Sequence, residues 1–331
     1  MTDCMNARST TRLLALCLFA LATSQAAFAA GDLVRLGNLK FAHYGAVSYM
    51  KTVCPKHGIQ LDEHVFAKGL DIIPGILAGE VDVAASAADA SVSARAAGAP
   101  IYVVAGFAKG GARIVARPDL PIKSVADLRG KRVGVARGGA QELLLLAELS
   151  KAKLSWSDKG DKDVQILYLA YADLNQALLA KNIDAMCQSE PQSSQAISKG
   201  YGKEVLKPYD TALGEPVRAL VMTEKLYDEK PEVAARLLSC FVESTRFFLE
   251  HPAEAEKYVR EVVFKGQLSA QDYADAIGNS PFTYDITVEH VQTTADLMVE
   301  YGVGKLAKAP QAKQYVKLDL LERAKKEQGI H

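Results

Sequence analysis

The hydrophobic pattern after position 30 alternates between short apolar runs and segments with helical periodicity. Asp32–Leu39 alternates apolar and polar residues as a half-buried strand does, and Val81–Ala85 is a short apolar run typical of a strand covered on both faces. Further strands are predicted at Ile59–Phe66 and Ile101–Ala105, with helices at Ala46–Val53, between Asp71 and Gly79, and at Ala90–Ala97. This strand–helix order predicts a parallel sheet with helices on both faces.

A second unit of the same kind follows. The strand Ala112–Ala116 comes directly after the strand at 101–105, with no helix between them. Strands are then predicted at Lys131–Ala136 and Val164–Leu169, a helix at Leu143–Leu149, and an apolar return strand at Val217–Met222. We therefore expect one lobe from 30–111 and 215–331 and a second from 112–214, with hinge strands near Gly110–Ala116 and Gly214–Leu220.

One segment of the chain is repeated in both predicted lobes. Val65–Ser86 aligns without gaps with Leu167–Gln188, 102 residues further on, and both read as strand end, helix, tight turn and strand. Asp82 and Asp184 occupy the same position in the two turns, so we interpret them as structural residues. Two similar α/β lobes imply a cleft between them, and we expect Ser86 and Gln188 to face it.

The C-terminal third is predicted to be helical. Amphipathic stretches punctuated by proline are expected to form helices that pack on the first lobe, at Glu232–Leu249, Ala253–Phe264, Ala270–Ile277, Val288–Tyr301 and Gln314–Lys326.

The first thirty residues have the composition of an export signal. Arg8 and Arg12 precede an apolar run at Leu13–Ala22, and Ala27-Phe28-Ala29 fits a cleavage site, so 1–29 is predicted to be a signal peptide. The chain has 39 basic and 39 acidic residues, and removing these 29 leaves a net charge of −1. This balance argues against a nucleic-acid partner, which needs a basic excess.

Cysteine and histidine give no sign of a metal centre or of covalent catalysis. Cys54, Cys187 and Cys240 would remain after cleavage; at most one pair can form, and the sequence does not say which. The sequence has no CxxC, HExxH or GxSxG motif. We therefore expect no metal, no cofactor and no catalytic residue.

Ligands of open α/β sheets bind beyond the carboxyl ends of the parallel strands. The most specific segment there is Gly138-Gly139-Ala140-Gln141, where small residues open a helix and leave backbone N–H groups for an anion. The full set of candidate ligand-binding residues is His43, Tyr44, Lys68, Ser86, Ala87, Phe107, Gly138, Gly139, Ala140, Gln141, Tyr171, Gln188 and Glu190.

Five polar or aromatic residues have an open choice of role. Phe107 and Tyr171 are placed either to sandwich an organic ligand or to join the core, and Glu190 either caps a helix or accepts from a ligand amine. Arg113 and Arg218, on the two hinge strands, either pair with acids or reach the ligand.

Several motifs occur in the order found in a known protein family. Ile76–Ala84 (ILAGEVDVA), Ala96–Pro100 (AAGAP), Ile122–Val135 (IKSVADLRGKRVGV) and Ile183-Asp184-Ala185 followed by Glu190-Pro191 resemble the periplasmic substrate-binding proteins of ABC importers for nitrate, taurine, aliphatic sulfonates and thiamine-precursor pyrimidines. The resemblance implies the class II periplasmic-binding-protein fold, two doubly wound α/β lobes joined by two crossover strands with a ligand cleft between them.

The resemblance also implies a function. We expect a monomeric periplasmic protein, not an enzyme, that captures a small organic anion such as a sulfonate or carboxylate by lobe closure and delivers it to ABC transporter permease and ATPase subunits. Binding of a pyrimidine-type thiamine precursor, or a thiamine-pyrimidine-synthase-like activity, is the alternative. The expected donors are the N–H groups of Gly139, Ala140 and Gln141 with the side chains of His43, Lys68 and Gln188.

Overall fold

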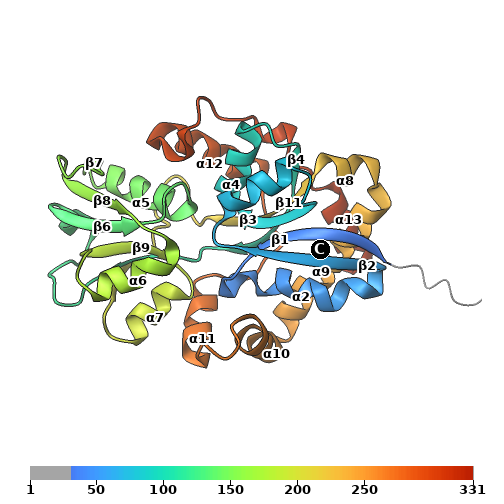
Figure 1. The fold of residues 1–331 in the computed structure, drawn as a ribbon, viewed down its shortest axis with the longest axis horizontal. Helices are drawn as coiled ribbons and strands as arrows, with labels where there is room; N and C mark the ends of the chain where they lie inside the picture. Colours follow the sequence, from blue (N-terminus) through green and yellow to red (C-terminus); the bar gives the residue numbers. More distant parts are fainter. Residues whose placement is uncertain (1–30, 331) are drawn as a thin grey trace, which may run out of the picture.

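The computed structural model describes residues 31–330, and within them the strands form two separate sheets (Figure 1). The first sheet has the order β2-β1-β3-β11-β4. Its strands are β1 (Asp32–Leu39), β2 (Ile59–Phe66), β3 (Val83–Ala87), β4 (Ile101–Lys109) and β11 (Val217–Thr223). β1 runs parallel to β2 and β3, whereas β11 is antiparallel to both β3 and β4. The predicted signal peptide, 1–29, lies outside the described residues.

The second sheet has the order β10-β5-β9-β6-β8-β7. Its strands are β5 (Ala112–Ala116), β6 (Lys131–Val135), β7 (Trp156–Ser157), β8 (Val164–Tyr168), β9 (Ala185–Ser189) and β10 (Lys203–Leu206). β6, β8 and β9 are parallel, and β5 is antiparallel to β9 and β10. The two sheets therefore have the same arrangement: a group of parallel strands is followed by one antiparallel strand, β11 in the first sheet and β5 in the second.

Helices cover both faces of each sheet, as expected. In Figure 1, α2 and α4 lie on opposite faces of the first sheet, and α5 lies across the second sheet from α6 and α7. The α-helices are α2 (Gly45–Val53), α3 (Ile73–Leu77), α4 (Ala88–Ala96), α5 (Ala140–Lys151), α6 (Tyr171–Leu179), α7 (Gln192–Ser198), α8 (Glu224–Glu229), α9 (Pro231–Glu250), α10 (Pro252–Tyr258), α11 (Ala270–Gly278), α12 (Val288–Tyr301) and α13 (Asp319–Glu327).

Shorter helical turns connect these elements. They are η1 (Ala42–Tyr44), η2 (Cys54–His57), η3 (Gly69–Ile72), η4 (Val125–Leu128), η5 (Val259–Val263), η6 (Val303–Lys305) and η7 (Ala312–Gln314). Among the helices of 31–330, none combines the length and the apolar character needed to cross a bilayer.

The 102-residue repeat is confirmed in structure. The bounds of β3 and β9 differ by 102 positions, and the two strands occupy the same place in their sheets. Asp82 accepts hydrogen bonds from the backbone N–H (3.0 Å) and the Nε (2.9 Å) of Arg35, and Asp184 accepts the same pair from Arg132 at 2.9 and 3.3 Å. Both aspartates thus tie a helix-to-strand turn to the neighbouring strand, which confirms their structural role.

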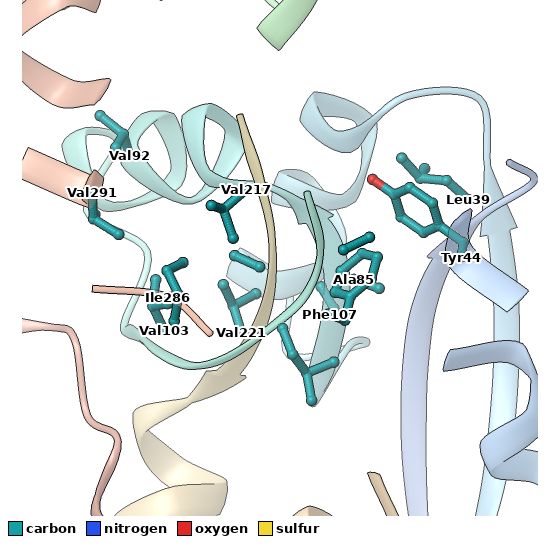
Figure 2. Close-up of a cluster of buried hydrophobic side chains, with 14 of the residues drawn as sticks. Leu39, Tyr44, Ala85, Val92, Val103, Phe107, Val217, Val221, Ile286 and Val291 are labelled. Carbon is teal, nitrogen blue, oxygen red and sulfur yellow. The ribbon is translucent and has the colours of Figure 1, made fainter. Parts of the chain in front are cut away.

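The core of the first lobe lies between its sheet and these helices. Figure 2 shows Val103 and Val221 of adjacent strands packed near Ile286, and Phe107 beside Ala85. Phe107 is fully buried, and its ring meets that of Tyr44 edge-on with centroids 4.8 Å apart. This ring therefore belongs to the core.

A disulfide joins η2 to the longest helix, α9. Cys54 and Cys240 are bonded across 186 residues of sequence, and Cys187 is a buried free thiol. This settles which of the three cysteines pair. The bridge fastens the first βα unit to the C-terminal helices that cover it.

Two of the predicted boundaries were wrong because of strand pairing with distant parts of the chain. The strand expected to end at Ala105 continues to Lys109, because β11 pairs with β4 along that length. The helix expected from Gln314 begins at Asp319, because Val316 forms a parallel bridge to Val103 at the edge of the first sheet. In both places an interstrand hydrogen bond overrides the local pattern.

Candidate ligand-binding site

A cavity lies where the carboxyl ends of the two parallel strand groups face each other. The volume that the centres of water molecules can occupy in it is about 40 Å³. That volume is enough for about three waters. Its lining comes from both lobes: Leu39, Phe41, His43, Tyr44, Lys68, Gly69, Leu70, Ala87, Asp89, Ala90, Arg137, Gly139, Ala140, Gln141, Tyr171, Ser189 and Arg218. Almost all of these residues follow the carboxyl end of a parallel strand, as the rule for open α/β sheets requires.

Eight of the thirteen predicted binding residues line this cavity: His43, Tyr44, Lys68, Ala87, Gly139, Ala140, Gln141 and Tyr171. The structure brings them together from five different loops. The lining also includes Asp89 and Ser189, which are not among the predicted binding residues, and Arg218, whose role the sequence left open.

Arg218 is the central cation of the cavity. Its side chain is 2% exposed, and it reaches the cavity from the first residues of β11. Its Nε donates to His43 Nε2 at 3.1 Å, and a terminal nitrogen donates to the Gly110 carbonyl at 2.9 Å. No carboxylate oxygen of the described residues lies within 4.0 Å of its guanidinium. A buried cation without an ion pair is costly, so the site is prepared for an anion.

His43 is a neutral imidazole held by Arg218. Burial, with the neighbouring Arg218 charge, lowers the pKa of His43 well below its usual value. Because Nε2 accepts from Arg218, the proton of the neutral ring lies on Nδ1. That Nδ1 is buried and has no hydrogen-bond partner within residues 31–330. A donor is therefore left in the wall of the cavity.

The start of α5 supplies backbone donors. The N–H groups of Gly139, Ala140 and Gln141 donate to no acceptor in residues 31–330, as is usual for the first turn of a helix. The Tyr171 hydroxyl donates to Gln141 Oε1 at 2.5 Å and so fixes this side chain beside the helix start. Oriented N–H groups and the helix dipole favour a negative charge here.

Two more cations lie at the rim. Lys68 is 43% exposed on its side chain and lies 3.9 Å from Asp71. Arg137 is 54% exposed, stacks on the Tyr168 ring at 3.5 Å and lies 3.3 Å from Asp158. Their charges are partly screened by water, so they attract an anion toward the cavity more than they hold it there.

The prediction that Glu190 accepts a hydrogen bond from the ligand was wrong. It is fully buried and takes no part in the cavity lining. Its carboxylate lies 2.7 Å from Arg113 Nε, accepts from Ser194 Oγ at 2.6 Å and accepts from Asn279 Nδ2 at 2.8 Å. All its hydrogen-bonding capacity is used inside the protein, and none remains for a ligand.

The two arginines on the hinge strands, Arg113 and Arg218, have different roles. Arg113 lies 2.7 Å from Glu190, 2.9 Å from Asp275 and 3.0 Å from Glu204, so it pairs with acids. Arg218 pairs with none in the described residues and lines the cavity. The difference follows from position, because Arg113 belongs to the second sheet and faces α11, whereas Arg218 begins a strand of the first sheet.

Gln188 and Ser86 do not line the cavity, so their predicted cleft-facing position was wrong. Gln188 is buried; it donates to the Tyr171 carbonyl at 3.0 Å and to Asn175 Oδ1 at 3.2 Å, and its Oε1 accepts from the Ser189 N–H at 2.8 Å. Ser86 is also buried and is the next-to-last residue of β3. Each lies one strand position too early to reach the open end of its sheet.

Phe107 and Gly138 are also absent from the lining. Phe107 lies within β4 and its ring packs in the core, because the strand extends further than expected. The Gly138 N–H donates to the carboxylate of Glu142, four residues on. That donor is already satisfied, and the free N–H groups begin one residue later.

Comparisons with known proteins agree with this architecture. Residues 55–255 match the family described as NMT1/THI5 like. The chain belongs to the NMT1/THI5 like family. Its sequence is 33% identical over 144 residues to a putative aliphatic sulfonates-binding protein of Escherichia coli (strain K12), a match that covers 43% of each chain. The chain thus spans less than half the length of that relative.

Other known proteins are similar over more of their length. A putative ABC transporter periplasmic binding protein of Brachyspira hyodysenteriae is 21% identical over 343 residues, covering 95% of this chain and 97% of that protein. The alkanesulfonate-binding protein of Xanthomonas axonopodis pv. citri, solved with MOPS, superposes with a TM-score of 0.73 at 18% identity, covering 88% of this chain and 99% of the other.

The nitrate-binding protein of Synechocystis PCC 6803 gives a TM-score of 0.71 at 14% identity, covering 90% and 89% of the two chains. These likenesses confirm the periplasmic-binding-protein fold with two α/β lobes. At such identities they show only the fold of this NMT1/THI5 like protein. The class of its ligand has to be inferred from the residues that line the cavity.

Proposed function

We propose that this protein is the solute-binding component of an ABC import system and captures a small organic anion, a sulfonate, carboxylate or related oxyanion. The observation that carries the proposal is the Arg218 guanidinium, buried in the cavity between the two sheets without an ion pair in the described residues. An anion there would replace the water that the guanidinium has lost. The names of the sulfonate- and nitrate-binding relatives support the same class of ligand.

The donors come from both sides of the cavity. Arg218 and His43 belong to elements of the first sheet, whereas the N–H groups at Gly139, Ala140 and Gln141 belong to α5 on the second sheet. A ligand that contacts both sets has more contacts when the lobes are closed, so it favours the closed state. We therefore propose that capture occurs by lobe closure.

We assign 30–111 and 215–331 to the first lobe and 112–214 to the second. In support, β4 and β5 belong to different sheets and are separated only by Gly110 and Gly111. β10 and β11 also belong to different sheets, and the segment 207–216 connects them. Gly110 and Gly111 have φ of 64° and 79°, a conformation that favours glycine. These two connections are the proposed hinge.

A third segment supports this hinge, which the sequence did not suggest. The Gly111 N–H donates to the Asn279 carbonyl at 2.8 Å, and the Lys109 N–H donates to the Pro281 carbonyl at 3.0 Å. Asn279 Nδ2 also donates to the Ala112 carbonyl at 3.1 Å. The end of α11 therefore holds the first connection on both sides of the glycine pair.

The residues that line the cavity are arranged to bind a ligand and not to catalyse a reaction on it. The basic nitrogen of His43 already accepts from Arg218, and the Ser189 hydroxyl donates to the Gly111 carbonyl at 3.3 Å. Neither group is arranged as a base next to a nucleophile. In residues 31–330 no three His, Cys, Asp or Glu residues gather as a metal site would require. We propose that the ligand leaves unchanged.

The partners and location follow from the same proposal. We propose that the mature protein is a periplasmic monomer that delivers its ligand to permease and ATPase subunits. The Brachyspira relative named as an ABC transporter periplasmic binding protein supports this role, as does the predicted signal peptide at 1–29.

A thermal-shift screen of the mature protein tests the proposal. The panel contains sulfonates, carboxylates, nitrate and pyrimidines, and each hit is recovered and weighed by mass spectrometry. We expect at least one organic anion to raise the melting temperature and to be recovered with unchanged mass. Stabilisation by neutral pyrimidines alone, or recovery of an altered compound, would contradict the proposal.

A further inference from the structure

Two opposite charges are buried in the same cavity without pairing with each other. Asp89, in the first turn of α4, is 3% exposed and Arg218 is 2% exposed, and both line the cavity. No nitrogen of Arg218 lies within 4.0 Å of a carboxyl oxygen of Asp89. Within residues 31–330, no side chain donates a hydrogen bond to that carboxyl group. Asp89 therefore keeps hydrogen-bonding capacity for a proton or a ligand.

Burial makes this carboxyl group easy to protonate. The loss of water raises the pKa of Asp89 to about 6 against the opposing charge of Arg218 on β11, and the Glu142 carboxylate on α5 adds to the rise. The hydroxyls of Tyr44 and Tyr171 stay neutral, because burial, with the Asp89 charge, raises the pKa of both. The acid thus titrates close to neutral pH.

Helix α4 also packs against β3, β4, η3 and α12, whose charged groups are paired, exposed or neutral. β3 has no charged residue. The pairs on η3, on β4 and on α4 itself are Asp71 with Lys68 at 3.9 Å, Lys109 with Asp285 at 3.5 Å and Arg95 with Glu224 at 2.5 Å. On α12, burial lowers the pKa of His290 to about 4, so it is neutral near pH 7. The exposed acids of α12 are Glu289, Asp296 and Glu300.

Other buried groups near the cavity are less suited to accept a proton. His43 Nε2 already accepts from Arg218, and burial, with that charge, lowers the pKa of His43 well below its usual value. Both carboxylate oxygens of Glu142 already accept, one from a backbone N–H and one from a tyrosine hydroxyl. Glu148, further along α5, lies outside the cavity lining. A proton on Asp89 displaces no side-chain donor.

An anion in this cavity changes the balance at Asp89. Held by Arg218 and the first N–H groups of α5, it shares with Asp89 a space of about 40 Å³ that the rings of Phe41, Tyr44 and Tyr171 also line. Little water can separate two negative charges there, so the ionised carboxylate is disfavoured. A protonated carboxyl group has an O–H to donate, and its hydrogen bond to an anion is a strong one.

We propose, building on the proposed function, that capture of each anion is coupled to the uptake of one proton by Asp89. The proton comes from the solution, is held on a carboxyl oxygen of Asp89 and donates to the bound oxyanion, and it returns to the solution when the anion leaves. Because the complex holds this proton more tightly than the free protein does, the affinity for the anion falls as pH rises above about 6.

Calorimetry in two buffers tests this inference. The probes are ethanesulfonate, propionate and nitrate, which stay ionised above pH 6.5 and have no other titrating group. Each is titrated at pH 7 into the mature protein, Asp89→Asn and Asp173→Asn. Asp173 is the matched control, because it is also an acid in the first turn of a helix but is exposed and outside the cavity lining.

The buffers are Bis-Tris and Tris, which are cationic and do not compete for an anion site. Their enthalpies of ionisation differ, so the difference between the observed heats gives the number of protons taken up for each anion bound. The dissociation constant is also measured at pH 6.5 and at pH 8.5.

We expect the wild type and Asp173→Asn to take up about 0.5 to 1 proton per anion at pH 7, because Asp89 is mostly ionised before binding and mostly protonated after it. Their dissociation constants should rise about 5-fold to 50-fold from pH 6.5 to pH 8.5. Asp89→Asn should take up almost no proton, and its dissociation constant should stay within about twofold over the same range.

Two results overturn the inference and separate it from the proposed function. Binding without proton uptake in the wild type, or uptake that persists in Asp89→Asn, would refute the role of Asp89 while leaving anion capture intact. Failure of all three probes to bind at every pH would refute both. If Asp89→Asn does not fold, as judged by circular dichroism, the proton uptake and the pH dependence of the wild type decide.

Discussion

Asp89 keeps an ionisable carboxyl group inside the protein at a cost to stability. Burial raises its pKa from 3.8 to about 6, against the favourable field of Arg218. The folded protein therefore binds this proton more tightly than the unfolded chain, and the free energy of unfolding falls as pH rises from about 4 to 6. Above that window the folded protein carries the full cost of the buried charge.

Replacing Asp89 by asparagine should remove this pH-dependent cost. We expect Asp89→Asn to be more stable than the wild type at pH 8, by up to about 3 kcal/mol, and to lose that advantage at pH 4.5. Urea unfolding at the two pH values measures the difference. Asp173→Asn serves as the control and should follow the wild type; a difference between wild type and Asp89→Asn that does not change with pH would contradict the assignment.

At the residue scale, the sequence predicted the loops better than the individual side chains. His43, Lys68 and Tyr171 were found because parallel strands end at the cleft. Asp89 does not stand out in the sequence as a binding residue, because an acid in the first turn of a helix is an ordinary partner of the helix dipole. Its distinguishing property is burial, which depends on the opposite lobe and leaves no local signal.

Helix α5 is the element that presents donors to the ligand. A Cβ atom at Gly139 would lie 2.7 Å from the Tyr171 hydroxyl, so a larger side chain must displace Tyr171 and enter the cavity. We expect Gly139→Leu to weaken anion binding at least about 100-fold, because it blocks the approach to several charged hydrogen bonds at once, while the far-UV circular dichroism stays unchanged.

Gly278→Leu is the matched control for that experiment. Gly278 ends α11, and a Cβ atom there meets nothing within 4 Å. The control should bind like the wild type in the same titration. Undiminished affinity of Gly139→Leu would place the ligand away from the start of α5.

The disulfide between η2 and α9 closes a long stretch of chain. Because Cys54 and Cys240 are 186 residues apart, their bond restricts the unfolded chain strongly, and we expect its loss to lower the free energy of unfolding by about 2–5 kcal/mol. Guanidinium unfolding with and without reductant measures this. The double variant Cys54→Ala/Cys240→Ala should not respond to reductant; a wild type equally insensitive to it would show that the bond contributes nothing.

At the element scale, the repeated segment was the best guide. Asp82 and Asp184 could be assigned as turn residues because the same short-range pattern occurs twice. The end of β4 and the start of α13 could not be predicted, because pairing with β11 and the bridge to Val316 depend on segments more than a hundred residues away. The disulfide partner was undetermined for the same reason.

At the scale of the whole molecule, the contacts between the lobes extend beyond the cavity. Trp156 on β7 meets Tyr301 at the end of α12 edge-on, with ring centroids 6.2 Å apart. Ser198 on α7 donates to Asp272 on α11 at 2.6 Å. Both contacts join the second sheet or its helices to C-terminal helices, so a change in lobe angle must alter them.

The chain contains a single tryptophan, which makes this contact easy to monitor. We expect a bound anion to change the emission of Trp156 saturably, with the same midpoint as calorimetry, because closure moves it relative to Tyr301. The variant Tyr301→Leu should bind equally well but show a different emission change. Binding without any change in emission in the wild type would contradict movement at this contact.

The two α/β sheets and most of the loops that line the cavity could be predicted from the alternation of strands and helices. The contribution of Arg218 could not be assigned, because β11 runs antiparallel to its neighbours and brings the beginning of a strand to the edge where the others end. The rule for parallel strands does not cover that case.

The measurement that tests the account most directly is calorimetric titration of Arg218→Met beside the wild type, with the best anion from the screen. Arg323→Met is the control, since Arg323 is an exposed arginine on α13 outside the cavity. We predict that Arg218→Met stays folded but loses at least about 100-fold in affinity, because the substitution removes the only fully buried cation that lines the cavity within residues 31–330. Affinity within about twofold of the wild type would contradict the claim that this protein holds an anion at Arg218.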